Sequence, residues 1–184
     1  MLSIFDDMTQ VTEAEVQRLL ACAGEPQRTD ALRFKHLTGQ FEYLKTWLML
    51  TEMLEKLGVT DFELQYNEHG KPSLLHYPDI HFNMSHCRNG LAVAVDNQPI
   101  GIDIESFRAP NPDLLKKTMN EAERADIHDT VDFIRYWTMK EAVLKLRGTG
   151  IVDDLHKVLD GVGYRLETSV NLEKQYVLTL AYSI

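Results

Sequence analysis

Apolar positions along this chain repeat at two spacings, one typical of helices and one typical of strands. In the first part of the sequence, Thr12 with Glu15 three residues later forms a possible capping box. Gly58 is placed to end a long helical pattern. The elements predicted here are helices over residues 12–20 and 31–57 and strands over residues 62–66, 80–83 and 91–95.

The same two spacings recur after Pro99, which lies in a predicted turn. The elements predicted in this part are a strand around residues 101–105, helices over 113–119, 121–129 and 131–146, and strands over 163–167 and 175–183. Helices and strands therefore occur in both parts. We predict an α+β fold with two halves of similar size, residues 1–98 and 99–184, that meet near the 101–105 strand.

Composition narrows the class of protein. The chain has 184 residues, 44% of them hydrophobic and 26% charged, which is typical of a soluble globular protein that buries a core. A net charge of −9 argues against nucleic-acid binding. No apolar run is long enough to cross a membrane and no signal peptide precedes the first element, so a cytoplasmic location is expected. Cys22 and Cys87 lack metal-ligand spacing and are expected to be free thiols.

Two carboxylates stand at alternate positions in the predicted 101–105 strand. Asp103 and Glu105 therefore face the same side, whereas Ile102 and Ile104 face the other side and are expected to be buried. Two like charges this close are best tolerated with a cation between them. Gly101 allows another backbone or a ligand to approach closely. A solvent-exposed strand edge is the alternative interpretation of this pattern.

The predicted 131–146 helix supplies a third carboxylate and a lysine. Glu141 and Lys145 are four residues apart, which in isolation indicates a surface ion pair. Glu141 also shares a helix face with Trp137, at the border between core and solvent. An acid there needs a partner, and a metal ion held together with Asp103 and Glu105 would supply one. Oxygen ligands favour Mg²⁺ over zinc, while Mn²⁺ stays possible, and Lys145 would stabilise a phosphoryl oxygen nearby.

A serine and a histidine follow the 80–83 strand. Ser85 and His86 are adjacent, and no Gly-x-Ser-x-Gly elbow surrounds the serine, so a serine hydrolase is disfavoured. The pair is better suited to binding an anion. Lys71, between Gly70 and Pro72, could similarly present an ammonium group to a phosphate, although an ordinary hairpin turn explains it equally well.

Four motifs stand in the order of a known family, in the segments 70–72, 82–86, 99–105 and 137–145. Their sequences are Gly-Lys-Pro, Phe-Asn-Met-Ser-His, Pro-Ile-Gly-Ile-Asp-Ile-Glu and Trp-Thr-Met-Lys-Glu-Ala-Val-Leu-Lys. Together they resemble the 4'-phosphopantetheinyl transferases of the larger, monomeric, surfactin-synthetase-activating type. The matched stretch covers close to half of the chain.

The resemblance implies a fold of two pseudo-symmetric α+β halves with the active site in the cleft between them. It implies an enzyme that moves the phosphopantetheine arm of coenzyme A onto a serine of an apo acyl or peptidyl carrier protein and releases adenosine 3',5'-bisphosphate. The residue roles it implies are Mg²⁺ ligands at Asp103, Glu105 and Glu141 and a diphosphate contact at Lys145. It also implies that Ser85 and His86 bind around the 3'-phosphate of coenzyme A and that Lys71 lies on the coenzyme A side. Glu141 or a metal-bound water would take the serine proton, and Lys140 matches the motif without a clear role.

The N-terminal half departs from the family pattern. Relatives carry more arginine and lysine in the helix before Gly70, whereas here residues 40–47 are poor in them, which leaves Arg28 and Arg33 as candidates for the adenosine phosphates. The carrier is expected to dock on residues 111–124 through Lys116 and Lys117. A monomer is expected because both halves are in one chain. A metal-dependent nucleotide phosphohydrolase and a non-catalytic module that binds coenzyme A or a carrier are the alternatives.

Overall fold

The computed structural model describes residues 1–150 and 154–184. Its helices are α1 (Glu13–Cys22), α2 (Glu25–Ala31), α3 (Leu37–Glu55), α4 (Pro112–Thr118), α5 (Glu121–Asp126) and α6 (Thr130–Arg147), with 3-10 turns η1 (Met8–Gln10) and η2 (Leu155–Asp160). Its strands are β1 (Leu2–Phe5), β2 (Leu64–Tyr66), β3 (Pro72–Leu74), β4 (His81–Cys87), β5 (Gly90–Asp96), β6 (Ile100–Ser106), β7 (Tyr164–Asn171) and β8 (Tyr176–Ser183). The predicted α+β class is confirmed.

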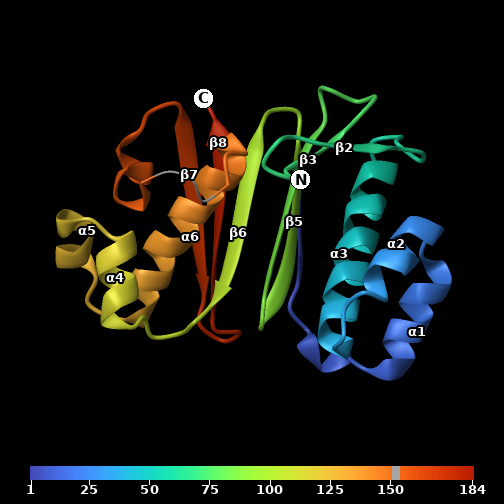
Figure 1. Cartoon of the computed structure of the whole chain (residues 1–184), viewed down its shortest axis with the longest axis horizontal. Coiled ribbons are helices and arrows are strands. Elements are labelled where there is room, and N and C mark those ends of the chain that lie inside the picture. Colours follow the sequence, from blue (N-terminus) through green and yellow to red (C-terminus); the bar gives the residue numbers. More distant parts are fainter. Residues whose placement is uncertain (151–153) are drawn as a thin grey trace.

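Two three-stranded antiparallel sheets form the centre of the molecule. Their strand orders are β1-β5-β4 and β6-β8-β7, and a separate hairpin pairs β2 with β3. Helices α1 to α3 lie on one side of the sheets and α4 to α6 on the other, as Figure 1 shows. Each sheet therefore carries one long helix, α3 or α6.

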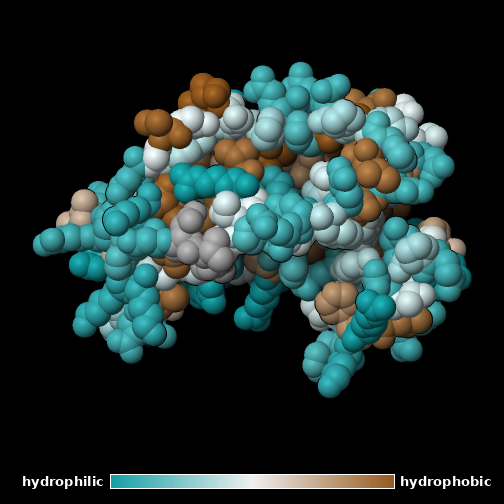
Figure 2. Space-filling view, turned by 45° about the horizontal axis from the view of Figure 1, so that its top comes forward, coloured by the Kyte–Doolittle hydropathy of each residue, from teal (hydrophilic) through white to brown (hydrophobic). Residues whose placement is uncertain are grey.

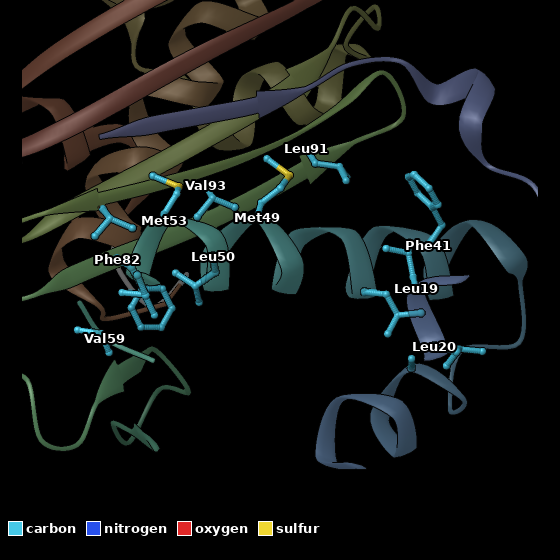
Figure 3. Close-up of a cluster of buried hydrophobic side chains, with 14 of the residues drawn as sticks. Leu19, Leu20, Phe41, Met49, Leu50, Met53, Val59, Phe82, Leu91 and Val93 are labelled. Atoms are coloured by element: carbon cyan, nitrogen blue, oxygen red, sulfur yellow. The ribbon is translucent and has the colours of Figure 1, made fainter. Parts of the chain in front are cut away.

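Helix α3 packs on β5 through the larger of the hydrophobic clusters. Figure 3 shows Met49 and Met53 of α3 pointing toward Leu91 and Val93 of β5. Short helix α1 adds Leu19 and further apolar side chains to the same cluster. Burying such apolar surface is the main driving force for this half to fold.

Strand β6 separates two environments by the alternation of its side chains. Ile102 and Ile104 are fully buried against Ala92 and Ala94 of β5, between the two sheets. Gly101 faces α6 so closely that a Cβ there would lie 2.0 Å from the Ala142 carbonyl oxygen. The backbone that Gly101 was expected to admit is therefore that of α6, which brings Glu141 and Lys145 against the strand with the other two acids.

The two sheets meet at a seam between β4 and β6 that lacks main-chain pairing. The Asn83 side-chain oxygen accepts a hydrogen bond from the Ile102 N–H at 3.0 Å. The Ser85 hydroxyl accepts one from the Ile104 N–H at 3.3 Å. Side chains of β4 thus satisfy edge N–H groups of β6 that a neighbouring strand would otherwise satisfy.

Several N-terminal predictions need correction. The helix predicted over 31–57 is α3, which begins only at Leu37, and α2, which ends at Ala31, was not predicted. The strand predicted over 80–83 continues to Cys87, so Ser85 and His86 lie within β4 and not in a loop after it. The strand predicted over 62–66 begins at Leu64, and β1 and β3 were not predicted. Hydrophobic alternation missed these short strands because β1 and β3 span only four and three residues.

The C-terminal predictions agree with the structure more closely. Helix α6 ends at Gly148, whose φ of 69° is the left-handed conformation that glycine adopts easily. The helix predicted over 121–129 is shorter, and β7 extends beyond the predicted 163–167 strand.

The capping box predicted at the start of α1, in the N-terminal half, is half formed. Thr12 accepts a hydrogen bond from the Glu15 N–H, which is one of its two hydrogen bonds.

The outer surface is mainly hydrophilic on the face shown in Figure 2. Hydrophobic residues appear there as separate spots among hydrophilic ones. Within the described part of the chain, no helix is both long enough and apolar enough to cross a bilayer.

Candidate active site

Asp103 is the buried centre of the site. It is 4% exposed, and its Oδ1 accepts hydrogen bonds from the Ser85 hydroxyl at 2.9 Å and from the Lys145 ammonium at 2.7 Å. Lys145 also donates to the Ser85 hydroxyl at 2.8 Å. The other oxygen, Oδ2, is buried and accepts no hydrogen bond from the described residues. A buried carboxylate oxygen without a donor is costly, so a ligand or cation there would be stabilising.

Glu105 lies two residues further along β6 and is half-buried. Its Oε1 accepts a hydrogen bond from the Trp137 indole at 3.2 Å, and the Arg108 guanidinium lies 3.8 Å away. Burial raises the pKa of Glu105, and the negative charge of Asp103 raises it further. Its protonated form is therefore favoured more than in an exposed glutamate.

Glu141 on α6 experiences the same two effects. Burial raises the pKa of Glu141, followed by the charge of Asp103, whereas Lys145 lowers it and Glu105 raises it again. The charge of Asp103 thus acts on both glutamates, and the charge of Glu105 acts on Glu141. The shared face of Asp103 and Glu105 and the proximity of Glu141 are as the sequence led us to expect.

These acids are not arranged as a closed metal cage. Residues 1–150 and 154–184 contain no group of three or more Asp, Glu, His or Cys side chains arranged to hold a metal ion. The donor chemistry nevertheless fits a hard divalent cation. Every candidate atom is an oxygen, Asp103 Oδ2 has no donor among the residues that the structure describes, and the Asp103 charge raises the pKa of both glutamates. Lys145 provides the positive charge beside Asp103 in this structure.

The turn between β2 and β3 reaches across to the end of α6. Lys71 Nζ donates to the Leu146 carbonyl at 3.0 Å, and Asn67 donates to the Gly148 carbonyl at 2.8 Å. Burial lowers the pKa of Lys71. A cleft of about 210 Å³, the α6 cleft, opens here, and its lining includes Lys71, Met84, Glu141 and Lys145. The expected lysine is in the site, but its ammonium is bonded to the protein backbone.

Next to the α6 cleft lies a larger space lined by aromatic side chains. Two cavities of about 390 and 240 Å³ share Phe34, Tyr43, Trp47 and Met84, and we call them together the aromatic hollow. Met84 also lines the α6 cleft, so the two spaces adjoin. His86 lines the aromatic hollow, and its Nε2 lies 3.8 Å from a carboxylate oxygen of Glu42.

Comparison with known proteins identifies this arrangement. Residues 99–179, which include Asp103, Glu105, Glu141 and Lys145, match the model of the 4'-phosphopantetheinyl transferase superfamily. A 4'-phosphopantetheinyl transferase from Bacillus subtilis is 30% identical over 150 residues, covering 77% of this chain and 67% of the relative. The chain belongs to this superfamily.

Other members of the superfamily match over a similar range. The 4'-phosphopantetheinyl transferase Sfp of Bacillus subtilis strain 168 is 28% identical over 77% of this chain and 67% of its own length. The transferase psf-1 of Bacillus pumilus is 27% identical over 74% of this chain and 63% of its own length. The expected membership in the Sfp-like group of these transferases, and hence the expected class of enzyme, is confirmed.

The structure does not bring every predicted residue of the transferase into the site. Arg28 donates to the carbonyls of Leu20 and Ala23 at the end of α1, so it caps that helix. Arg33 does line the aromatic hollow, but it is paired with Asp30 at 2.9 Å. The Ser85 hydroxyl is committed to the seam and to Asp103, which leaves His86 as the exposed member of the pair.

Sequence reasoning also missed contacts that the structure shows at or near the site. Trp137 was interpreted as part of a packed stripe, yet its indole N–H binds Glu105. Glu42 faces His86 from α3, where only basic residues were sought. Lys140, which had no clear role, is buried and donates to Glu123 at 2.7 Å and to the Leu155 carbonyl at 2.6 Å. The sequence signal for Lys140 was its position at helical spacing from Trp137 and Leu144, in line with apolar residues.

Proposed function

We propose that this enzyme transfers the 4'-phosphopantetheine arm of coenzyme A to a serine of an apo acyl or peptidyl carrier protein and releases adenosine 3',5'-bisphosphate. The observation that carries the proposal is the meeting of Asp103, Glu105, Glu141 and Lys145 at β6 and α6, beside two adjoining cavities. The carboxylates, one of which has an unsatisfied oxygen, suit a divalent cation that neutralises a diphosphate. The lysine suits the phosphoryl oxygens themselves.

Coenzyme A is proposed to bind along the α6 cleft and the aromatic hollow. Its diphosphate lies in the α6 cleft near Lys145, and its adenosine lies in the aromatic hollow, where ring stacking is favourable. His86 then faces the 3'-position of the ribose. Lys71 and Ser85 shape the donor side through the contacts that they make with α6 and Asp103, and Arg33 lies at the outer rim.

The transfer is a substitution at phosphorus. The hydroxyl oxygen of the carrier serine forms a bond to the phosphorus that bears pantetheine, and the bond from that phosphorus to the bridging oxygen breaks. The bridging oxygen keeps the electron pair and leaves on adenosine 3',5'-bisphosphate. Glu141, whose pKa is raised by burial, is the group of this chain placed to accept the serine proton. Lys145 stabilises negative charge that develops on the phosphoryl oxygens.

Asp103, Glu105 and Glu141 are the residues that would hold Mg²⁺, or Mn²⁺ in its place. Such a cation neutralises charge on the diphosphate when bound. Support for this comes from Asp103 Oδ2, which accepts no hydrogen bond within residues 1–150 and 154–184, and from the Asp103 charge, which raises the pKa of both glutamates. The protein's own contribution is to keep the three carboxylates close, by packing β6 against α6 through Gly101.

The carrier is proposed to dock beside the site on residues 111–124. Lys116 and Lys117 are exposed in the last turn of α4, where cations are favourable next to the helix C-terminus. They could meet an acidic helix of the carrier. We propose that the enzyme works as a monomer in the cytoplasm, with the two predicted halves, 1–98 on the coenzyme A side and 99–184 on the metal side, in one chain.

One assay separates this function from its alternatives. The protein is incubated with coenzyme A, Mg²⁺ and an apo carrier, and the carrier is weighed by mass spectrometry. We expect the mass of one phosphopantetheine group to be added to the serine. Cleavage of coenzyme A without a carrier would indicate a phosphohydrolase, and binding without turnover a non-catalytic module.

A matched pair of variants tests the site in the same assay. Asp103→Asn is expected to abolish transfer, because it removes the charge at the centre of the network while keeping its shape. Glu173→Gln, in the exposed turn between β7 and β8, is the control and should transfer at the wild-type rate. Full activity in Asp103→Asn would remove this residue from the mechanism.

A further inference from the structure

The aromatic hollow contains a carboxylate where an anion would be expected to bind. Glu42 projects from α3 with its side chain 16% exposed, and its Oε2 lies 3.8 Å from Nε2 of His86. Among the described residues that line the cavity around them, Glu42 is the only carboxylate and His86 the only nitrogen base. The remaining lining is aromatic, apolar or neutral. An anion that binds to His86 is therefore also repelled by the Glu42 carboxylate.

Nearby basic residues do not compensate for Glu42. Arg33, in the adjoining cavity, is already paired with Asp30 at 2.9 Å. Lys45, the next basic residue on α3, lies over the ring of Phe5 with 4.6 Å between its ammonium and the ring centre. The hollow thus offers stacking surface for a neutral ring but little net positive charge.

We infer that Glu42 makes the aromatic hollow select against a phosphate monoester beside His86, so that the enzyme uses dephospho-coenzyme A, which lacks the 3'-phosphate, at least as well as coenzyme A. This inference rests on the proposed function and specifies its donor. A 3'-phosphate bound at His86 carries up to two negative charges and would lie within reach of the Glu42 oxygens. One carboxylate about 4 Å from a phosphate oxygen in a half-buried groove is sufficient for about tenfold discrimination.

The chemistry of transfer is unchanged with this donor. The serine oxygen attacks the same phosphorus, and the bond to the same bridging oxygen breaks. The leaving group is then adenosine 5'-monophosphate. The diphosphate and pantetheine, which lie toward the α6 cleft, are identical in the two donors, so any difference in rate reports the hollow around His86 and Glu42.

The test compares kcat/KM for coenzyme A and for dephospho-coenzyme A with the same apo carrier. The wild-type ratio of the two values is expected to be one or below. In Glu42→Gln, which keeps the side-chain shape without the charge, we expect the ratio to rise about tenfold in favour of coenzyme A. Glu52→Gln is the matched control, because Glu52 is an exposed residue of the same helix and should leave the ratio unchanged.

A binding measurement needs no turnover and separates this inference from the proposed function. Calorimetry with adenosine 3',5'-bisphosphate and with adenosine 5'-monophosphate should show that Glu42→Gln gains affinity only for the bisphosphate. Transfer from neither donor would overturn the proposed function, while this comparison still tests Glu42. A wild-type ratio above one, which is a preference for coenzyme A, or the same ratio in Glu42→Gln as in the wild type, would overturn the inference. Glu42→Asp, which withdraws the charge by one methylene, serves if the glutamine variant does not fold.

Discussion

The contact between Gly101 and α6 makes the most stringent prediction about the site. A Cβ at this position would lie 2.0 Å from the Ala142 carbonyl oxygen and 2.5 Å from the Leu146 nitrogen, both of them backbone atoms. Ordinary contacts begin near 3.4 Å, so α6 would have to move away from β6 by on the order of 1 Å in Gly101→Ala. No side-chain rotation can relieve the clash, because the atoms involved belong to the helix backbone.

The consequences of this displacement can be estimated for stability and for activity. Forcing extra volume into a packed core costs about 1–3 kcal/mol, and a backbone clash belongs at the upper end, about 3 kcal/mol. The same movement carries Glu141 and Lys145 away from Asp103. A misplacement of about 1 Å in a catalytic arrangement costs about a hundredfold in rate.

Urea unfolding and the carrier mass assay measure the two effects in the same protein sample. Gly24→Ala is the control, since Gly24 has an ordinary φ of −64° and an added Cβ would meet mainly the flexible end of Gln27. We expect that control to lose less than about 1 kcal/mol, the range of an altered helix N-cap, and to retain activity. A Gly101→Ala protein with wild-type stability and turnover would refute the close packing of β6 on α6.

Three further predictions address other parts of the structure. Lys140→Met should lower the free energy of unfolding by about 3–5 kcal/mol in chemical denaturation, because it leaves Glu123 buried without its partner; a loss below 1 kcal/mol would contradict the buried pair. Millimolar Mg²⁺ should raise the thermal midpoint of the wild type but not of Asp103→Asn, since a ligand stabilises only the state that binds it, and an equal rise in both would exclude Asp103 as a ligand. Asn67→Ala should cost about 1 kcal/mol or more in urea unfolding, because it removes the hydrogen bond to the Gly148 carbonyl and the two that the Asn67 side-chain oxygen accepts from the His69 and Lys71 N–H groups; an unchanged midpoint would show that these bonds contribute nothing.

The sequence predicted the arrangement at β6 and α6 better than the aromatic hollow, and the reason is physical. Around Asp103 and Glu141, strand alternation and helical spacing determine which side each residue faces, so local rules suffice. Gly101 was correctly expected to allow a close approach, and the structure identifies α6 as the neighbour. These inferences required only that one strand and one helix form where the pattern indicates.

The aromatic hollow depended on contacts that no local pattern encodes. Glu42 meets His86 only because α3 packs across the sheet that contains β4, 44 positions later in the chain. Arg28 was a candidate because of its charge, yet its guanidinium donates hydrogen bonds to carbonyls at the end of α1. Ser85 was predicted to lie in a loop because the strand pattern ends at Asn83. Strand β4 in fact continues past Ser85, and the Ser85 hydroxyl points into the seam.

The seam between β4 and β6 bears on whether either half could exist alone. Were the chain divided between Asp96 and Ile100, the main-chain N–H groups of Ile102 and Ile104 would lose the acceptors that Asn83 and Ser85 provide. The alanine face of β5 would also be exposed to water together with the isoleucines of β6. Separately expressed fragments should therefore aggregate or stay unfolded until they are mixed, and co-refolding of the two pieces would be the way to restore a working molecule.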